Sequence, residues 1–294
     1  MTLLEWGGLR AETLWPLYRA EQSRWRAALA WDTATIWATI ESARVTWGLP
    51  GLVCCDTAGD IRGWTYFLRH GDRIEIGGVV SDSREATEAL VDGARRQGAG
   101  IDGFVFGGAV GLNDALSARG ISCDRYSYLV HPTNRVPFQR PGHALRPWKT
   151  HDVAATAALL REAYGDGGQL FAREGTIGEW RTYLDQLLSY AGCGILRPDL
   201  SRIVEVDGRV TALALVTSLG TDTAHLAQLA VGPGMRRSGI ARALLAEAMK
   251  AAHAAGFAQM SLLVSEANAP ARGLYETWGF AERGEFTSLR SEQT

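Results

Sequence analysis

Hydrophobic residues in the second half of the chain switch between helical and strand spacing. The run RIVEVDGRVTALALVTS places two β-rich segments around Asp207-Gly208, which is a strong hairpin signal. The apolar run 223–231 indicates a third, buried strand. The other expected elements are helices at 152–164, 179–192 (closed by Gly192), 239–256 and 269–278, and strands at 259–264 and from Phe280. This order predicts an α+β domain with a mixed sheet.

The first half repeats this order of elements. We expect helices at 37–48 and 83–100, a short helix in NDALSARGI, and strands in GLVCCD, RGWTYFLRH, 72–80 and IDGFVFGG. Between the halves, the stretch HPTNRVPFQRPGHALRP contains four of the nine prolines and has no sustained period. We therefore predict two tandem domains of one fold, residues 1–140 and 141–294.

Composition and charge narrow the class of protein. The 294 residues are 46% hydrophobic and 21% charged, with a formal net charge of −2, which is typical of a globular domain and gives no reason to expect nucleic acid or a membrane as partner. The four cysteines form no CxxC pair and follow no signal peptide, so we expect reduced thiols in a cytoplasmic protein. The six histidines are scattered, and we expect no metal site.

The stretch VGPGMRRSGIARALL, residues 231–245, joins a strand to a helix through three glycines, a proline and two adjacent arginines. The first N–H groups of a helix lack partners and favour an anion. Gly234 and Gly239 would let a phosphate approach the backbone, Ser238 would cap the helix, and Arg236 and Arg237 would add charged contacts. Neither a P-loop nor a dinucleotide-binding glycine motif is present.

Two segments carry a family resemblance. Arg236-Arg237-Ser238-Gly239-Ile240-Ala241 resembles the R/Q-x-x-G-x-G/A signature of the GNAT superfamily of acyl-CoA-dependent N-acyltransferases, and LLVSEANAPARGLYETWGF resembles a downstream segment of the same family. The resemblance covers about residues 146–290. It implies a tandem protein in which each domain has a mixed, mostly antiparallel twisted sheet flanked by helices.

The resemblance also implies a cofactor site for acetyl-CoA, the acyl donor. In the family, the pantetheine arm lies between two splayed strands, and the pyrophosphate meets the turn that follows. The residues implied here are the strand backbone Leu229, Ala230 and Val231, the turn residues Arg236, Arg237, Ser238, Gly239, Ile240 and Ala241, and Asn268 beside the arm.

Catalysis requires an acid for the departing thiolate and a base for the amine. Tyr275 matches the family tyrosine that lies by the sulfur and serves as general acid. For the base, His225, Glu266 and ordered water are the alternatives. The acceptor is expected near 163–180, where Asp166, Glu174 and Glu179 either favour a cationic amine or are merely solvated.

The first half lacks these groups. In the internal alignment Arg84 stands where the second half has Gly239, and Leu116 stands where it has Tyr275. We therefore expect a degenerate first domain that is structural or shapes the acceptor site. Because this copy makes the turn without the glycines, we expect ligand approach, rather than the turn itself, to require Gly239. Seven of the ten tryptophans lie in the first half, which favours packing over an aromatic wall for an acceptor.

The sequence thus predicts an N-acetyltransferase that moves an acetyl group from acetyl-CoA to a primary amine of a small molecule by direct attack. The alternatives are a protein N-terminal or lysine acetyltransferase, and a non-catalytic acyl-CoA-binding or sensing protein. A tandem aminoacyl-tRNA-dependent transferase fits less well, because the CoA signature is present and the chain has no basic excess. The sequence predicts no oligomeric state.

Overall fold

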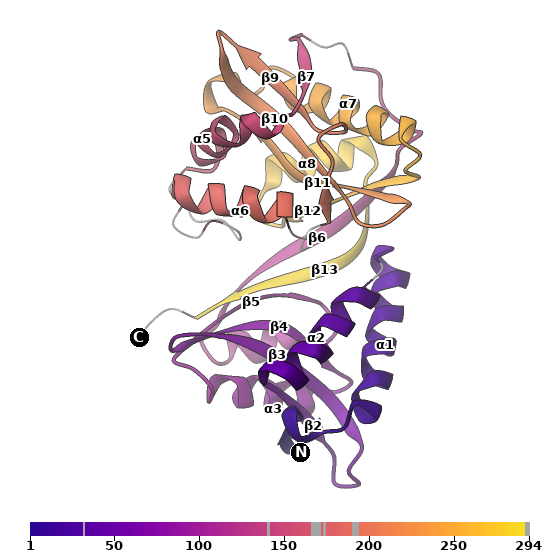
Figure 1. Cartoon of the computed structure of the whole chain (residues 1–294), viewed down its shortest axis with the longest axis vertical. Helices are drawn as coiled ribbons and strands as arrows, with labels where there is room; N and C mark the ends of the chain where they lie inside the picture. Colours follow the sequence, from indigo (N-terminus) through magenta and orange to yellow (C-terminus); the bar gives the residue numbers. More distant parts are fainter. Residues whose placement is uncertain (32, 140–141, 166–171, 173–174, 190–193, 292–294) are drawn as a thin grey trace. The chain divides into compact units, whose positions relative to one another are not determined.

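The computed structural model describes residues 1–31, 33–139, 142–165, 172, 175–189 and 194–291 (Figure 1). The chain forms two compact units. Unit 1 comprises Met1–Tyr128, Val264–Ala269 and Arg283–Thr294, and unit 2 comprises Leu129–Leu263 and Pro270–Glu282. Each unit is therefore built from segments that are separated in the sequence by segments of the other unit. The boundary expected between residues 140 and 141 lies outside the described residues.

Unit 1 contains a twisted sheet in the strand order β1-β2-β3-β4-β5-β13-β6. Strands β4 and β5 pair in parallel, whereas β1–β2, β2–β3, β3–β4 and β5–β13 are antiparallel. Its elements are β1 (Thr2–Glu5), the 3₁₀ turn η1 (Trp6–Gly8), α1 (Ala11–Leu29), α2 (Ala34–Trp47), β2 (Gly51–Cys55), β3 (Ile61–His70), β4 (Arg73–Ser81), α3 (Arg84–Arg95), β5 (Gly100–Phe106), α4 (Leu112–Ser117) and β6 (Ser122–Pro132).

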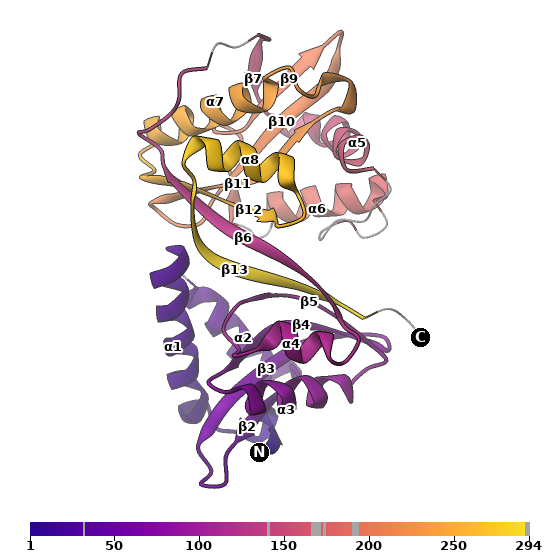
Figure 2. The same ribbon diagram turned by 180° about the vertical axis from the view of Figure 1, so that it is seen from behind.

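Helices cover both faces of this sheet (Figures 1 and 2). On one face α1 and α2 bury an aromatic cluster that includes Trp6, Tyr18, Trp37 and Trp64, and on the other α3 and α4 pack aliphatic side chains. The expected packing role of the tryptophans matches this cluster. Helix α1 did not follow from the sequence pattern.

Unit 2 repeats the plan, with the strand order β6-β12-β11-β10-β9-β7 and β8 beside β10. Strands β11 and β12 pair in parallel, whereas β10–β11, β8–β10, β9–β10 and β7–β9 are antiparallel. Its elements are β7 (Leu145–Pro147), η2 (Thr150–Asp152), α5 (Val153–Tyr164), α6 (Ile177–Ser189), β8 (Ile195–Leu196), β9 (Arg202–Val206), β10 (Arg209–Ser218), β11 (Thr223–Val231), η3 (Pro233–Met235), α7 (Ile240–Ala254), β12 (Gln259–Ser265), α8 (Ala269–Trp278) and β13 (Ala281–Arg290).

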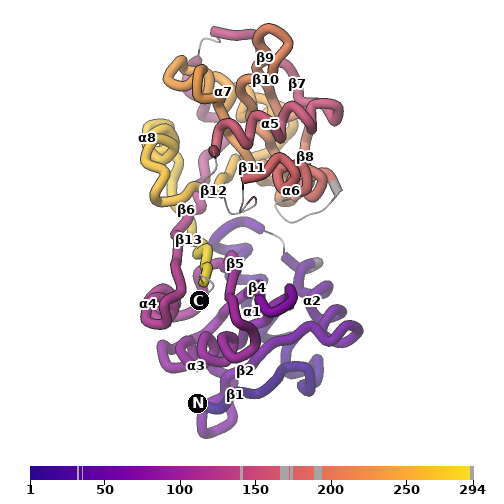
Figure 3. The backbone as a smooth tube through the Cα atoms, turned by 90° about the vertical axis from the view of Figure 1, so that its left-hand side faces the viewer, coloured from indigo at the N-terminus to yellow at the C-terminus, as the bar shows by residue number. Residues whose placement is uncertain are grey.

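The layers of unit 2 can be followed in Figure 3, where α5 and α6 lie on one side of the strands and α7 and α8 on the other. The predicted hairpin joins β9 to β10, and Asp207 and Gly208 both have positive φ, as this turn requires. The expected end of α6 at Gly192 lies outside the described residues. None of the described helices is both long and apolar enough to cross a membrane.

The last strand of the second half pairs in unit 1, and the last strand of the first half ends in unit 2. Strand β13 pairs with β5 in unit 1, from Phe286↔Phe106 to Arg290↔Asp102, and Phe286 packs against Phe104 and Phe106. The end of β6 belongs to unit 2 and lies beside β12. The strand after Phe280 is confirmed, but its partner was not predicted, because pairing between distant segments leaves no local pattern.

Candidate functional site

Strands β11 and β12 separate in the middle of unit 2. Their parallel pairing runs from Thr223↔Gln259 to Leu226↔Leu262 and stops there, although β11 continues to Val231. At this point β11 carries one extra residue, Ala227, because Leu226 and Gln228 oppose the adjacent residues Val216 and Leu215 of β10. A bulge bends its strand and ends pairing. One edge of β11 is therefore released from β12.

The released edge exposes backbone of the residues expected to hold a pantetheine arm. The N–H of Gly232 donates to the carbonyl of Thr211 in β10. Since successive residues of a strand point their peptide groups to opposite sides, Val231 and Leu229 point theirs away from β10. Ala230, between these two residues, points its peptide groups toward β10.

The turn that follows β11 spans Gly232–Gly239 and leads into α7. The expectation that Ser238 caps this helix is wrong: the N-cap is Gly239, and the Ser238 hydroxyl donates to the Met235 carbonyl. The hydroxyl satisfies the 3₁₀ turn and is not available to the helix. The N–H groups of Ile240, Ala241 and Arg242 therefore have no acceptor in the described part of the chain.

Gly239 is required by its own backbone conformation. Its φ is +84°, which side-chain-bearing residues rarely adopt, and a Cβ at this position would meet nothing within 4 Å. The expectation that the turn itself does not need this glycine is therefore wrong. Gly234 also faces open space but lacks a positive φ.

The two neighbouring arginines differ in their contacts. The Arg236 guanidinium donates to the carbonyls of Val231 and Ala163, which fixes the turn to β11 and α5. Arg237 is exposed, has φ +61°, and forms no ion pair with any described residue. A residue other than glycine in this conformation costs free energy and often marks a functional position. Arg237 is thus the arginine available to an anion.

Tyr275 lies on α8 and is buried, with its ring 5.5 Å from that of Phe280. Burial, and to a smaller extent Tyr164, raises the pKa of the Tyr275 hydroxyl above its ordinary value. The hydroxyl is therefore protonated at neutral pH and can act as a proton donor.

The two candidate bases are engaged in the fold. His225 is buried in β11, its Nδ1 lies 2.9 Å from the Ser261 hydroxyl of β12, and burial lowers its pKa to about 4. Glu266 forms an ion pair with Arg125 at 2.6 Å, and both belong to unit 1. Asn268 also belongs to unit 1, where its N–H donates to the Ser265 carbonyl.

A hydrogen-bonded group beside the opened strand was missed in the sequence. The Tyr164 hydroxyl donates to Gln228 Oε1 at 2.8 Å, and Gln228 Nε2 donates to the Tyr183 hydroxyl at 3.0 Å. Trp180 stacks on Tyr164, and its buried Nε1 has no hydrogen-bond partner among the described residues. The signal was Gln228 itself, a polar residue within the apolar run HLAQLAV.

Of the three acidic residues expected near the acceptor, the structure describes Glu179. Asp166 and Glu174 lie outside the described residues. Glu179 accepts hydrogen bonds from the N–H and hydroxyl of Thr176, whose hydroxyl in turn accepts from the Glu179 N–H. This reciprocal arrangement stabilises the start of α6.

Unit 1 contains the counterpart of this opening in a closed form. Pairing of β4 with β5 also stops after four residues, at Ile76↔Gly103, and Gly77 is the extra residue. Here, however, the N–H of Ser81 donates to the Gly108 carbonyl, and Ser81 forms a bridge with Ala109. The released edge of β4 is therefore covered by the chain that follows β5.

The turns into the two equivalent helices also differ. Only Asp82 and Ser83 separate β4 from α3, and the Ser83 hydroxyl caps the helix by accepting from the Ala86 N–H. Ser83 therefore occupies the N-cap position of Gly239, and the expected match of Arg84 to Gly239 is wrong by one residue, because helix spacing alone cannot fix the start of a helix. Arg84 pairs with Asp114, and Leu116 is buried in the core.

Comparison with known proteins agrees with this geometry. Residues 160–280 match the model of the acetyltransferase (GNAT) family. No curated protein sequence matches the chain.

Solved structures resemble nearly the whole chain. A GCN5-related N-acetyltransferase from Sphaerobacter thermophilus has a TM-score of 0.67 at 15% identity, covering 99% of this chain and 95% of its own. A tandem GNAT protein from the clavulanic acid biosynthesis pathway has a TM-score of 0.55 at 14% identity, with coverage of 84% and 83%. The glucosamine N-acetyltransferase region of a fungal multi-domain β-N-acetylglucosaminidase has a TM-score of 0.60 at 13% identity, with coverage of 98% and 38%.

These similarities extend over both halves of the sequence, and the family match falls on the half with the open strand edge. Residues 160–280 thus match the acetyltransferase (GNAT) family, whose fold supports acyl transfer, and the chain as a whole has the fold of tandem GNAT structures.

Proposed function

We propose that the protein is an N-acetyltransferase that uses acetyl-CoA as acyl donor and a small-molecule primary amine as acceptor, with its cofactor site in unit 2. The observation that carries the proposal is the open edge of β11 leading into an uncapped α7. An open strand edge and a helix start with free N–H groups are complementary to an amide-bearing arm and a pyrophosphate.

The residues present fit the donor. The peptide groups of Leu229 and Val231 would meet the pantetheine arm, and the N–H groups of Ile240 and Ala241 would meet the pyrophosphate. Arg237 would add a charge-assisted contact, since its guanidinium has no carboxylate partner in the described chain. Arg236 would hold the turn in place through the Val231 and Ala163 carbonyls.

Bound acetyl-CoA supplies the thioester whose acetyl group is transferred. The acceptor nitrogen forms a bond to the acetyl carbon, and the bond from that carbon to sulfur breaks. Tyr275 donates the proton of its hydroxyl to the departing sulfur. A tyrosine hydroxyl is protonated at neutral pH, and burial raises the pKa of this one further.

We assign the amine proton to solvent rather than to His225 or Glu266. The lowered pKa of His225 makes it a weak base, and its Nδ1 is engaged with Ser261. The Glu266 carboxylate is paired with Arg125. His225 serves instead to connect β11 to β12 next to the point where they separate.

For the acceptor, we propose a small amine whose body carries hydroxyl groups. Gln228 contacts the phenols of Tyr164 and Tyr183, which donate and accept hydrogen bonds. Trp180 adds an apolar face, and its N–H has no hydrogen-bond partner in the described part of the chain. Glucosamine is a suitable first probe, because the fungal region of similar fold is named for its acetylation.

The test is thiol release from acetyl-CoA by the full chain, with glucosamine, spermidine and a lysine peptide as acceptors. We expect turnover with a small amine and loss of kcat by about 10²-fold or more in Tyr275→Phe. Calorimetry should give one CoA site per chain. The outcome that contradicts the proposal is absence of CoA binding, whereas tight binding without transfer to any amine would select the acyl-CoA-sensing alternative.

A further inference from the structure

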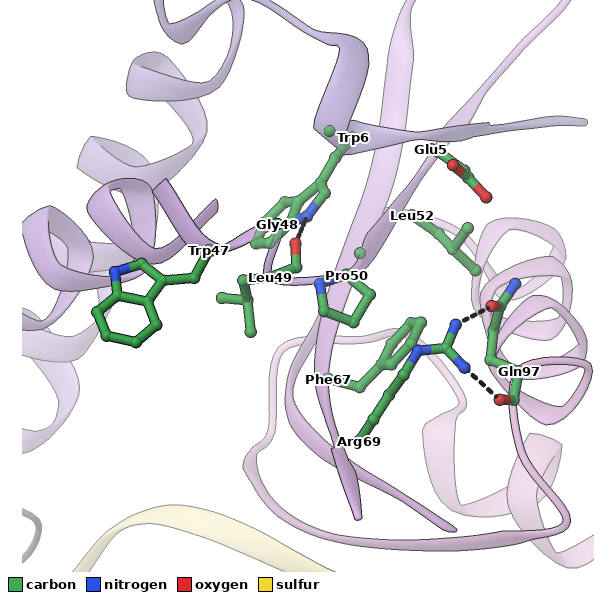
Figure 4. A pocket seen from close by; sticks show the side chains of 12 residues that line it. Glu5, Trp6, Trp47, Gly48, Leu49, Pro50, Leu52, Phe67, Arg69 and Gln97 are labelled. Atoms are coloured by element: carbon green, nitrogen blue, oxygen red, sulfur yellow. Dashed lines mark hydrogen bonds between the residues drawn. The ribbon is translucent and has the colours of Figure 1, made fainter. Parts of the chain in front are cut away.

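A pocket lies in unit 1 and takes no part in the proposed acetyl transfer. It has a volume of about 460 Å³ and is bounded by η1, the loop after α2, the start of β2, the end of β3 and Gln97 (Figure 4). Arg69 in this part of β3 pairs with Ile74, near the start of β4, whereas the closed counterpart of the cofactor opening lies at the other end of β4, near Ser81.

Buried contacts give the pocket rigid walls. The Trp6 indole is buried, and its Nε1 donates to the Leu49 carbonyl at 2.7 Å. A Cβ at Gly51 would lie only 2.3 Å from the Trp6 ring, so the strand must carry glycine there. Arg44 further fixes η1 by donating to the carbonyls of Trp6, Gly7 and Leu9. A pocket formed in this way does not have to be organised by its ligand.

One end of the pocket carries the exposed guanidinium of Arg69, which two hydrogen bonds hold in place. Arg69 donates from Nη1 to the Gln97 carbonyl at 2.9 Å and from Nη2 to Gln97 Oε1 at 2.7 Å. Both acceptors are neutral, and no described carboxylate forms an ion pair with Arg69. Gln97 therefore orients the guanidinium without neutralising it, and no described residue accepts a hydrogen bond from the Arg69 Nε–H, which with the neighbouring Nη–H forms the other edge of the guanidinium. That edge matches the two oxygens of a carboxylate.

An apolar strip of three side chains crosses the pocket beside Arg69. Leu49 and Pro50 lie between Arg69 at one end and Trp47 at the other, and Phe67 lies beside the Arg69 stem (Figure 4). The Trp47 side chain is 83% exposed, which is unusual for an indole at the end of a helix. Glu5 at the rim adds one negative charge, so the lining has no net charge and disfavours a phosphate dianion.

We propose that this pocket binds a monocarboxylate with an elongated apolar body. The carboxylate lies against the free edge of Arg69, and the apolar body covers Leu49 and Pro50 and reaches Trp47. The site would give the catalytically degenerate unit a ligand of its own, and it does not depend on acyl transfer in unit 2.

The test uses phenylbutyrate as probe and phenylbutanol as its neutral analogue, with calorimetry and ligand-observed NMR on the full chain. We expect phenylbutyrate to bind at least about tenfold more tightly than phenylbutanol and phenyl phosphate, since only the carboxylate pairs with Arg69 without a second charge. Saturating CoA should not displace it.

Variants locate the site. Arg69→Gln should weaken phenylbutyrate binding about tenfold or more, and Arg69→Lys, which keeps the charge but loses the two-pronged edge, should weaken it less. Trp47→Ala should weaken it several-fold by removing apolar contact. Arg19→Gln, an exposed arginine on α1, should leave binding unchanged. Equal binding of acid and alcohol, unchanged binding in Arg69→Gln, or displacement by CoA would each overturn the proposal.

Discussion

The two units make the same strand separation and then treat it in opposite ways. In each, parallel pairing ends after four residues at a one-residue bulge, Gly77 in unit 1 and Ala227 in unit 2. In unit 1 the freed strand edge is covered by Gly108 and Ala109, and Ser83 caps the next helix. In unit 2 the edge stays open, and the helix begins uncapped at Gly239.

The difference shows that the separation of strands belongs to the fold itself. A binding site forms only where the separation leaves backbone N–H and C=O groups without partners. Unit 1 satisfies its peptide groups with its own chain, which stabilises the unit and removes the site. Unit 2 leaves equivalent groups for a ligand. Free backbone donors at a surface cost little while water occupies them.

The largest expected effect on stability comes from a substitution in β13, the strand that the end of the chain contributes to unit 1. Phe286 is buried in unit 1 among Trp25, Phe104 and Phe106, whereas Phe280, only a few residues earlier, packs in unit 2 against Tyr275. Phe286→Ala should cost about 3–5 kcal/mol and lower hydrogen-exchange protection in β5. Phe280→Ala should act on α8 and the end of β6 instead, where its ring contacts Tyr275 and His131. Equal loss of protection in both units from either variant would contradict the assignment.

The same register position carries different side chains in the two sheets. Glu75 in β4 is half exposed, whereas its counterpart His225 in β11 is buried. The pKa of His225 is about 4 in the folded chain and about 6.5 in the unfolded chain. Between pH 7 and pH 4, His225 therefore takes up a proton in the unfolded state but stays neutral in the folded state.

Unfolding free energy should therefore fall by up to about 3 kcal/mol across this range because of His225. His225→Gln should remove that part of the dependence, which denaturant titrations at several pH values would measure. If the unfolding free energy depends on pH equally in wild type and His225→Gln, His225 is not the cause of that dependence. Acetyl transfer at neutral pH should stay within a few-fold of wild type, as expected for a residue that does not take the amine proton.

Gly239 allows conformation to be separated from ligand approach. Gly239→Ala should cost about 1 kcal/mol of unfolding free energy, because alanine is strained at φ +84°, and Gly239→Asn should cost less. Both should weaken CoA binding about tenfold if a Cβ occupies the path of the phosphate. Gly234→Ala should change neither quantity. CoA affinity in Gly239→Asn equal to wild type would mean that the glycine serves the turn alone.

The smallest effect concerns two exposed arginines. Arg84→Ala removes a surface pair with Asp114 and should change stability by no more than about 0.5 kcal/mol, with no effect on CoA affinity. Arg237→Ala should weaken CoA binding several-fold with similarly little change in stability. Calorimetry and thermal unfolding on both variants provide the comparison, and matching CoA affinities would remove Arg237 from the site.

Local patterns predicted most of the elements but not their partners. The hairpin at Asp207-Gly208, the buried strand of residues 223–231 and the helix that follows the glycine-rich turn are all present, because their signals lie in neighbouring residues. The pairing of β13 with β5 depends on residues almost two hundred positions apart, such as Phe286 and Phe106. No window of the sequence contains that information.

The sequence likewise predicted the local part of the candidate site but not the contacts between distant residues. Motif spacing identified the turn at Arg236–Ala241, but it assigned capping to Ser238, whose hydroxyl is used by the preceding 3₁₀ turn. The group formed by Tyr164, Gln228 and Tyr183 was missed, because its members come from three separate elements. A polar residue in an apolar strand was the available clue, and it becomes specific only when its partners are known.

The exchange of final strands has a consequence for cutting the chain. A protease that cleaves between β6 and β7 would leave two fragments, each of which supplies a strand to the unit formed mainly by the other. The nicked protein should remain assembled under native conditions and come apart only in denaturant. Two separately expressed fragments would have to fold on each other, which makes this junction a natural place to build a split reporter.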